Sequence, residues 1–362
     1  MAEDYFDLLG IPLGPFQFNP VTRTYYDFKT GQTVVPPPPS PGLGGYAAQL
    51  ANYPSLEYSW DLPNPVPADL LLPFRDFLAK YNIQDEAYTV YFSGQGFANI
   101  LDQLTVHVFK MVGMSFIRSI TGQAFQPASG NNAEIYAKAL PLLGPDALLS
   151  STVIASKRPS DHSGIKLVVK TGNDNKLRLI KAKKLLITAP PLLSNLLPFD
   201  LDANEKSLFA KWSHTNYFVM LVANTGLPSG FQYANAVASN ATLNIPSLPA
   251  AYQITETRVP GLFYVWYGSP VAISEAAVKA DVVATIKRVR PAAGSTSTAT
   301  PSFVKFESHS PFKLVVSKEA ILGGFYQKLK ACEFFFLFLF FSFFFPHFTP
   351  LFVVFSSFIL CN

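Results

Sequence analysis

The sequence predicts a mixed α/β (α+β) fold, because strand-like and helix-like patterns alternate along most of its 362 residues. The first observation is an apolar run, Leu185 to Ala189, which stops at Pro190-Pro191 and is typical of a strand buried on both faces. The second is a series of strand-like segments with tight turns, between residues 146 and 180, that leads into this run. The third is helical periodicity, which dominates the first third of the chain and returns after residue 201.

The proline-terminated strand fixes the point at which the chain leaves the sheet. Pro190 removes a backbone donor from the ladder, and the residue before it is pushed out of the helical region. We therefore expect the chain to turn here into a helical segment that ends near Leu197. Ligands of many open α/β sheets lie at the carboxyl end of such a strand. An ordinary core strand with a proline stop explains the same pattern, so the pattern alone assigns no ligand.

The first third is predicted to be mainly helical, aromatic and rich in loops. Residues 22–28 and 33–35 form a predicted hairpin around Gly31, and residues 36–41 form a polyproline-like connector. Helices are expected at residues 2–11, 45–53, 68–81, 99–112 and 132–143.

One segment of this region imitates a dinucleotide-binding fingerprint. Residues 89–92 have a strand-like pattern and are followed by Gly94 and Gly96. Asn99 stands where the fingerprint needs a small residue, which lets helix and strand pack closely. A ribose-binding acid at the end of a later strand is not evident either. We therefore reject a nucleotide site at this segment.

The second half contains the strongest strand patterns. Strands are expected at residues 146–156, 164–170, 176–180, 184–189, 216–224, 251–256, 262–267 and 302–307. Asp202 and Glu205 have the spacing of a capping box at the start of a helix, and Ser274 has the position of an N-cap. A last helix is expected at residues 318–330.

Charge and cysteine usage exclude several classes of function. The formal net charge is +4, and no run of lysine and arginine is long enough to indicate nucleic-acid binding. Basic residues do gather around one predicted hairpin, where we expect a solvated turn rather than an anion site: Lys176, Arg178, Lys181, Lys183 and Lys184. The only cysteines are Cys332 and Cys361, so the body of the chain has neither a disulfide framework nor a thiolate metal site. This usage suits a reducing compartment and the N-terminus lacks a signal-peptide pattern, so we expect a cytoplasmic protein.

The composition changes abruptly at Cys332. From Phe334 to Leu360 the chain has no charged residue, and by length and hydropathy this stretch qualifies as a transmembrane candidate. The excess of phenylalanine, the two prolines within the stretch and the absence of basic residues after it argue against a membrane helix. Codons for Cys332-Glu333-Phe334 can contain a splice-donor sequence. We therefore interpret residues 332–362 as intron read-through, with a genuine membrane span as the alternative.

The usual catalytic arrangements are missing from the sequence. It contains neither a GxSxG elbow nor a GxxxxGK[ST] loop. No two histidines have helical spacing for a metal, so no metal site is predicted. Ser160, Asp161 and His162 are adjacent, but a triad is an arrangement in space, and a turn explains them better.

The order of several stretches is more informative than any single motif. DALLSSTVIAS is followed by IKAKKLLITAPPLLSNL and PFDLDANEKSLFAKW, and later by LFYVWYGSP and SHSPFKL. The first third adds YAAQLANYPSLE, DLPNPVPADLLLPFRDF and NNAEIYAKALPLLG. In this order the stretches resemble the fungal flavin-containing amine oxidase superfamily, in particular its β-cyclopiazonate dehydrogenase-like, FAD-dependent oxidoreductases. The resemblance covers residues 1 to 331.

The resemblance implies that FAD lies across a Rossmann-like domain, beside a substrate domain of mixed sheet and helices that takes a small molecule. It implies that Val153 approaches the adenine side through its backbone, and that Thr188, Ala189 and Pro190 border the same cofactor. Four parts follow: residues 1–145, the helical part of the substrate domain with the hairpin; 146–200, the FAD-domain meander and proline-terminated strand; 201–331, the rest of the substrate domain; and 332–362, the tail.

The sequence also departs from the family. The family begins with a strand and a GxGxxG turn, whose helix N-terminus holds the pyrophosphate, and it ends with a glycine-containing segment against the isoalloxazine ring. Neither is found here, and residues 216–224 lack the lysine that many amine oxidases carry on this strand. We therefore expect an FAD-dependent oxidoreductase of the amine oxidase type by family, truncated at both ends and inactive as this polypeptide. The alternatives are a non-catalytic fragment or gene-model artefact that binds no FAD, and a protein anchored to a membrane by its tail.

Overall fold

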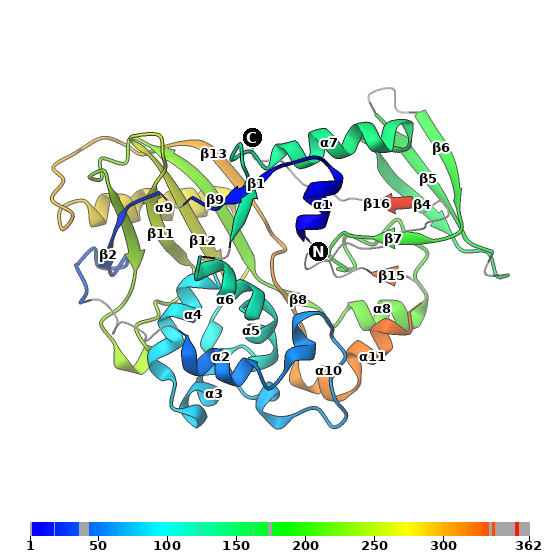
Figure 1. The fold of residues 1–362 in the computed structure, drawn as a ribbon, viewed down its shortest axis with the longest axis horizontal. Helices are drawn as coiled ribbons and strands as arrows, with labels where there is room; N and C mark the ends of the chain where they lie inside the picture. Colours follow the sequence, from blue (N-terminus) through cyan, green and yellow to red (C-terminus); the bar gives the residue numbers. More distant parts are fainter. Residues whose placement is uncertain are drawn as a thin grey trace. The chain divides into compact units, whose positions relative to one another are not determined.

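The computed structural model describes residues 2–17, 19–35, 43–122, 124–161, 163–172 and 176–332, and the backbone of residues 335–336 and 352–354. The chain forms two compact units (Figure 1). The first unit combines Met1–Phe16, Gln123–Trp212 and Glu319–Asn362, and the second combines Gln17–Gly122 and Ser213–Lys318. Each unit is therefore assembled from segments that are far apart in the sequence.

A six-stranded sheet organises the second unit, in the order β13-β9-β12-β11-β10-β2. Its strands are β2 (Thr22–Tyr26), β9 (Asn216–Ala223), β10 (Phe231–Asn235), β11 (Ala250–Glu256), β12 (Leu262–Ser269) and β13 (Ser302–Ser308). All neighbours are antiparallel except β10 and β2, which run parallel. The predicted hairpin at the N-terminus is confirmed in part: the Asp27 N–H donates to the Gln32 carbonyl at 2.9 Å and the Val34 N–H donates to the Tyr25 carbonyl at 3.0 Å, while β2 takes β10 as its ladder partner. Its expected return strand is reduced to one bridge between Tyr26 and Thr33.

Helix α9 (Glu275–Val289) packs on this sheet and closes the main core of the unit. Its N-cap is Ser274, as predicted, and the Ser274 side chain accepts a hydrogen bond of 3.2 Å from the Ala277 backbone N–H. The apolar stripe faces the sheet and is fully buried: Val278, Val282, Ile286 and Val289. Burying a side chain of this size stabilises a fold by roughly 1.5–3 kcal/mol, so the stripe fixes the helix on the sheet.

A helical layer with aromatic packing completes the second unit. Its helices are α2 (Gly44–Leu50), α3 (Phe74–Tyr81), α4 (Ala87–Ser93), α5 (Thr105–Met111) and α6 (Met114–Ile120). The ring of Phe109 meets those of Tyr46 and Phe77 edge to face, with centroids 5.2 and 5.3 Å apart. The strand-like pattern at residues 89–92 is wrong, because Ala87–Ser93 is helical, so the strand that a dinucleotide fingerprint requires does not form there.

Two of the predicted helices in this layer are broken, and the breaks pair with each other. Short 3₁₀ helices at Ala68–Leu71 and Ile100–Asp102 precede α3 and α5. Between them the Phe74 N–H donates to the Gln103 carbonyl at 2.8 Å, and the Thr105 N–H donates to the Leu72 carbonyl at 2.9 Å. Backbone pairing between remote segments therefore interrupts both helical patterns.

An antiparallel meander, β4-β5-β6, dominates the strands of the first unit. Its strands are β4 (Thr152–Lys157), β5 (Ile165–Thr171) and β6 (Lys176–Ala182). Strand β5 buries alternate residues, Ile165, Leu167 and Val169, as expected of a strand with one covered face. The predicted strand at residues 146–156 is wrong in its first half, since β4 begins only at Thr152.

The remaining elements of the first unit are short. They are α1 (Ala2–Leu8), β1 (Leu13–Pro15), β3 (Phe125–Pro127), α7 (Ala133–Leu143), β7 (Leu185–Ile187), α8 (Ala203–Phe209) and α11 (Phe325–Lys330). Helix α10 (Lys318–Leu322) begins at the last residue of the second unit and continues in the first. Strands β8 (Ser213–His214) and β14 (Leu314–Val315) belong to the second unit, where they pair with each other. The capping box of α8 is confirmed, since the Asp202 carboxylate accepts from the Glu205 N–H at 2.8 Å and Glu205 accepts from the Asp202 N–H at 2.9 Å. The predicted last helix is split by Gly323 and by Gly324, whose φ is +77°.

Strand β7 is the predicted proline-terminated strand. On its two sides the backbones of β15 (Phe335–Phe336) and β16 (Phe352–Val354) pair with it in parallel. The chain then forms turns and bends from residue 193 to 199, so the predicted helical segment after the prolines is wrong. The Asn195 side chain instead holds the turn by donating to the Pro190 carbonyl at 2.9 Å.

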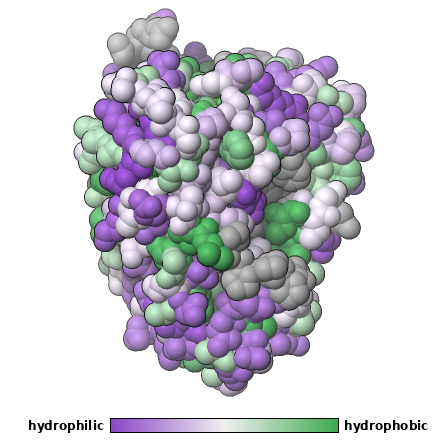
Figure 2. Space-filling model, turned by 90° about the vertical axis from the view of Figure 1, so that its left-hand side faces the viewer, coloured by the Kyte–Doolittle hydropathy of each residue, from purple (hydrophilic) through white to green (hydrophobic). Residues whose placement is uncertain are grey.

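Several sequence predictions fall outside the described residues: the polyproline connector, His162, Cys361 and most of the tail. Within the described part of the chain, no helix has the length and hydropathy needed to cross a membrane. The face drawn in Figure 2 mixes hydrophilic and weakly hydrophobic residues, and its strongly hydrophobic areas are small. The mixed α/β class itself is confirmed.

Candidate functional site

The predicted cofactor residues all lie in the first unit, on two different sheets. Val153 belongs to β4, where it lies opposite Val169 with its side chain buried. Strand β4 is the edge of its sheet, so one row of its backbone groups has no partner in the ladder. The register shifts between Val153 and Ala155, and such an irregularity bends the strand at this point. A backbone contact from Val153 to a ligand is compatible with this geometry.

The other three predicted residues follow β7 directly. Ala189 is buried, whereas Thr188 and Pro190 are half-buried. The Pro190 carbonyl accepts from the Asn195 side chain and, at 2.8 Å, from the Leu192 N–H. The carboxyl end of β7 is therefore held in one conformation, as a cofactor-bordering segment requires.

A second group of residues, in the second unit, was not assigned a role from the sequence. We call it the Tyr217 cluster, and it consists of Gln95, Tyr217, Tyr252, His309 and Phe312. The Tyr217 ring has its centroid 4.7 Å from that of Phe312 and 6.2 Å from those of Tyr252 and His309. Its hydroxyl donates to the Gln95 side-chain oxygen at 3.0 Å, while Gln95 donates to the Phe92 carbonyl. Three aromatic rings and an imidazole therefore meet at the start of β9.

Backbone pairing holds the cluster in place. The His309 N–H donates to the Tyr217 carbonyl at 2.8 Å, and the Phe312 N–H donates to the Thr215 carbonyl at 2.9 Å. Thr215 is buried and its hydroxyl donates to the Gly96 carbonyl at 2.6 Å. These bonds tie the loop at 309–313 and the segment after α4 to the same strand.

Two glycines make room for the rings. Gly96 has φ +94°, and a Cβ atom there would overlap the Phe312 ring. A Cβ atom on Gly268 would lie 2.6 Å from the Tyr252 hydroxyl oxygen. That hydroxyl donates to the Phe97 carbonyl at 2.7 Å and accepts from the Gly96 N–H at 3.2 Å. The close ring packing therefore depends on glycine at both positions.

The cluster is electrically neutral. Burial raises the pKa of the Tyr217 and Tyr252 hydroxyls, so both stay protonated at physiological pH. Burial also lowers the pKa of His309, although Glu307 acts in the opposite direction. The five residues include no carboxylate and no amine. This arrangement suits a neutral, apolar ligand better than an ion.

Buried basic groups lie in the same unit. The Lys313 ammonium is above the Phe97 ring, and burial, followed by the charge of Lys110, lowers its pKa to about 7. Burial, followed by the charge of Lys313, lowers the pKa of His107 to about 3. The His107 Nε2 atom has no hydrogen-bond partner among the described residues. Among those residues no group of histidine, cysteine and carboxylate side chains could hold a metal ion.

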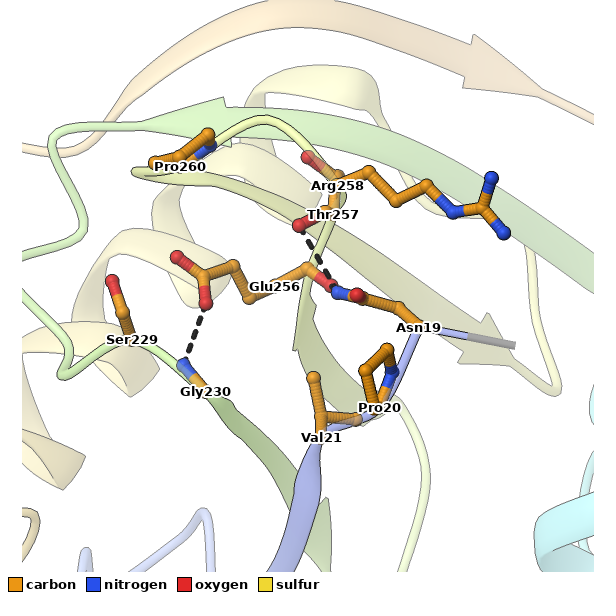
Figure 3. Close-up of a pocket in the computed structure, with 9 residues that line it drawn as sticks. All are labelled: Asn19, Pro20, Val21, Ser229, Gly230, Glu256, Thr257, Arg258 and Pro260. Atoms are coloured by element: carbon orange, nitrogen blue, oxygen red, sulfur yellow. Dashed lines mark hydrogen bonds between the residues drawn. The ribbon is translucent and has the colours of Figure 1, made fainter. Parts of the chain in front are cut away.

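The second unit also has a shallow pocket of about 230 Å³ beside the ends of β2, β10 and β11 (Figure 3). Two charged residues, Glu256 and Arg258, line it, and Glu256 accepts from the Gly230 N–H at 2.6 Å and from the Gly261 N–H at 3.3 Å. Asn19 closes another side by donating to the Thr257 carbonyl at 3.1 Å. The polar groups of this pocket thus serve to hold strand ends together.

The sequence contained a signal for the Tyr217 cluster without identifying its members. The stretch SHSPFKL includes His309 and Phe312, and the apolar strand at 216–224 includes Tyr217. Gln95 lies next to the rejected glycine fingerprint. Only the fold brings these segments together.

No protein-family profile matches the chain. Curated fungal proteins, in contrast, match the chain over most of its length. The chain is 42% identical to the FAD-dependent oxidoreductase pigF of Monascus ruber, covering 91% of this chain and 70% of that protein. It is 36% identical to the FAD-dependent oxidoreductase oblC of Cochliobolus heterostrophus, covering 92% and 71%. It is 30% identical to the β-cyclopiazonate dehydrogenase of Aspergillus oryzae, covering 91% and 72%.

Solved structures agree on the fold. A fatty acid isomerase from P. acnes that produces CLA superposes with a TM-score of 0.65 at 16% identity, over 91% of this chain and 76% of that one. Wild-type putrescine oxidase bound to putrescine superposes with a TM-score of 0.57 at 13% identity, over 90% and 76%. At these identities the likeness shows a shared architecture.

Proposed function

Because the chain belongs to the family of fungal FAD-dependent oxidoreductases with the amine oxidase type of fold, we propose that it derives from an enzyme that oxidises a small molecule with FAD. Bound FAD would supply the redox chemistry, by accepting a hydride from a C–H bond of the substrate while the adjoining C–N or C–C single bond becomes a double bond. The residues of the chain bind and orient the reactants and exclude water. The observation that carries this proposal is the 42% identity to pigF, which extends over 91% of the chain.

We propose that Val153 and the segment Thr188–Ala189–Pro190 form part of the FAD site. Two observations support this. Val153 lies on an edge strand with backbone groups outside the ladder. The turn after β7 is held by Asn195, so its backbone is preorganised. Their fit to the group is partial, because the 362 residues contain no GxGxxG turn for the pyrophosphate.

We further propose that the Tyr217 cluster belongs to the substrate site. Tyr217 and Tyr252 are buried, Phe312 is half-buried and His309 is exposed, and backbone bonds fix the segments that carry them, so the neutral rings can position a flat apolar molecule without a charge partner. The Tyr217 hydroxyl holds its proton on a buried ring, as does that of Tyr252, and Gln95 fixes the direction of the Tyr217 hydroxyl. The substrate class that fits is a neutral aromatic or fused-ring compound.

The polypeptide of 362 residues is proposed to be inactive on its own, since it has no glycine-rich turn with which to retain FAD. The visible absorption spectrum of the purified chain, before and after addition of FAD and gel filtration, tests this. We expect no flavin band to survive gel filtration. A band with one flavin per chain would overturn this part of the proposal and leave the family assignment intact. A cytoplasmic location stays a prediction.

Ligand-observed NMR with a panel of neutral aromatic compounds tests the substrate site without needing bound FAD. We expect saturation transfer to the binders, and weaker transfer for a Tyr217→Ala variant. Tyr264→Ala, at a half-exposed ring on β12, is the matched control and should bind like the parent. Equal binding by all three proteins would count against the Tyr217 cluster.

A further inference from the structure

The meander β4-β5-β6 presents one fully uncovered face, built from rows of residues that lie directly opposite one another. We call this set the outer face: Lys157-Lys166-Lys181, Ala155-Val168-Leu179 and Thr152-Lys170-Leu177. Eight of these nine residues are exposed, and Val168 is half-buried. The opposite face carries the buried residues Val153, Leu167 and Val169. The meander is therefore covered on one face only.

The middle row of the outer face is apolar, and exposed aliphatic side chains also lie beside it. Leu179 is 62% exposed and Leu177 is 63% exposed, both on the edge strand β6. Ile154, at the bulge of β4, is 45% exposed. Large aliphatic side chains on an exposed edge strand are a liability in water unless a partner covers them.

One end of the outer face is cationic, and Lys170 adds a charge at the other end. Lys157, Lys166 and Lys181 form one row across three strands, an arrangement of like charges that destabilises a sheet. Lys157 has Asp200 at 3.5 Å, whereas no carboxylate of the described residues pairs with Lys166 or Lys181. Between residues 152 and 184 the sequence has nine lysines and arginines and two aspartates, although the whole chain carries only +4. The positive charge of the protein is thus concentrated on the meander.

We propose that the outer face docks on a membrane surface that contains anionic phospholipids. Leu177 and Leu179 enter the boundary between headgroups and acyl chains, while the lysines extend to the lipid phosphates. The membrane charge also relieves the repulsion within the lysine row. The outer face offers aliphatic and ammonium groups and a single hydroxyl. It has no aromatic, amide or carboxylate group that would give the directional contacts of a protein or nucleic-acid interface.

Vesicle co-sedimentation of the full chain tests the proposal, with vesicles of phosphatidylcholine alone and with added phosphatidylserine. The measured quantity, called the gain, is the ratio of the affinity for vesicles with phosphatidylserine to the affinity for vesicles without it. This ratio cancels any binding that both kinds of vesicle share. Each lysine near such a surface contributes about fivefold in affinity, so Lys166→Ala/Lys181→Ala should reduce the gain by roughly 25-fold. Leu177→Ser/Leu179→Ser should weaken binding to the anionic vesicles and leave its salt dependence unchanged.

Lys29→Ala/Lys318→Ala is the matched control, because both lysines are exposed and belong to the second unit. It should keep the gain of the parent. Circular dichroism and equal thermal midpoints establish that all variants are folded. Equal gains for the Lys166/Lys181 variant and the control would overturn the proposal. Sedimentation velocity without lipid gives a second test. If the parent self-associates and the leucine variant does not, a second copy of the chain covers the outer face, and the proposal is overturned.

Discussion

The ammonium nitrogen of Lys313 lies 5.4 Å from the centroid of the Phe97 ring, in a side chain that is only 6% exposed. Its backbone is fixed at both ends of the residue, since the Lys313 N–H donates to the Thr215 hydroxyl and the Lys313 carbonyl accepts from the Thr215 N–H. The amine therefore cannot leave the interior without disturbing the loop that carries Phe312. Its ionisation is coupled to the stability of the Tyr217 cluster.

Replacing Lys313 by methionine should stabilise the protein at neutral pH. Burial lowers the pKa of the amine to about 7 in the folded state, whereas the unfolded chain has the ordinary value of 10.5. The unfolded state binds this proton more tightly than the folded state does. The resulting loss of folding stability is therefore complete below about pH 7 and fades as the pH rises to 10.5. A shift of this size corresponds to on the order of 4 kcal/mol. Urea unfolding of the parent and Lys313→Met at several pH values measures the difference.

The difference between the two proteins should be largest at about pH 6 to 7 and should shrink toward pH 10. Lys29→Met, at an exposed turn, should show no such pH-dependent difference. A constant difference across the pH range would mean that the pKa of Lys313 is the same in the folded and the unfolded chain, so that burial does not lower it.

His107 should remain a neutral imidazole far into the acid range. Its pKa is lowered to about 3 in the folded state, against an ordinary value of 6.5. The unfolded chain gains the proton first, so stability is lost as the pH falls from 6.5 toward 3. Histidine NMR of the folded protein should show no titration of His107 above pH 5, while a model peptide titrates near 6.5. A His107 midpoint near 6 would contradict its burial.

Substituting Gly96 by alanine should destabilise the protein more than the same change at Gly122. Both glycines have a positive φ, +94° and +99°, so both variants carry comparable backbone strain. Only the new Cβ at Gly96 would overlap Phe312, because nothing lies within 4 Å of a Cβ at Gly122. We expect Gly96→Ala to cost about 1–3 kcal/mol more in the free energy of unfolding. Equal costs would show that Phe312 can move without penalty.

The ion pair between Arg158 and Glu205 should contribute to stability, unlike the one between Arg75 and Asp102. The first has a 2.7 Å contact and side chains 18% and 2% exposed, and Glu205 also completes the capping box of α8. The second has side chains 48% and 57% exposed. Arg158→Met should cost on the order of 3 kcal/mol, because it leaves a buried carboxylate without its partner. Arg75→Met should cost less than about 1 kcal/mol.

Urea unfolding of both variants at neutral pH measures these costs. Similar losses for the two arginines would mean that burial of Glu205 does not matter. In that case the capping box alone would hold the start of α8.

Local patterns predicted the elements that local chemistry controls. Asp202 with Glu205 and Ser274 start helices as their spacing indicates, because each cap bonds to a residue three positions away. Remote partners decided the failures. Strand β2 finds its ladder partner in the remote β10, and the expected return strand keeps one bridge, at Thr33. The helix expected over residues 68–81 broke where Leu72 and Phe74 bond to a segment about thirty positions on.

The same distinction applies to the candidate site. The carboxyl end of β7 was visible in the sequence, since a buried strand and its proline stop are adjacent. The Tyr217 cluster was not, because Tyr217 and Gln95 are 122 positions apart and no local periodicity links them. Of the stretches that carry the resemblance, only SHSPFKL contains members of the cluster, His309 and Phe312, and only the fold showed that the side chains of the cluster meet.

The parallel pairing of β2 with β10 has a consequence for biosynthesis. Arg23 is in register with Gln232, which the ribosome adds 209 residues later. At typical rates of translation this delay is roughly 10–40 s. Strand β9 likewise pairs with β13, which begins at Ser302 and is synthesised later. The nascent second unit therefore holds unpaired strand edges and uncovered aromatic side chains through most of its synthesis, the period in which chaperones act.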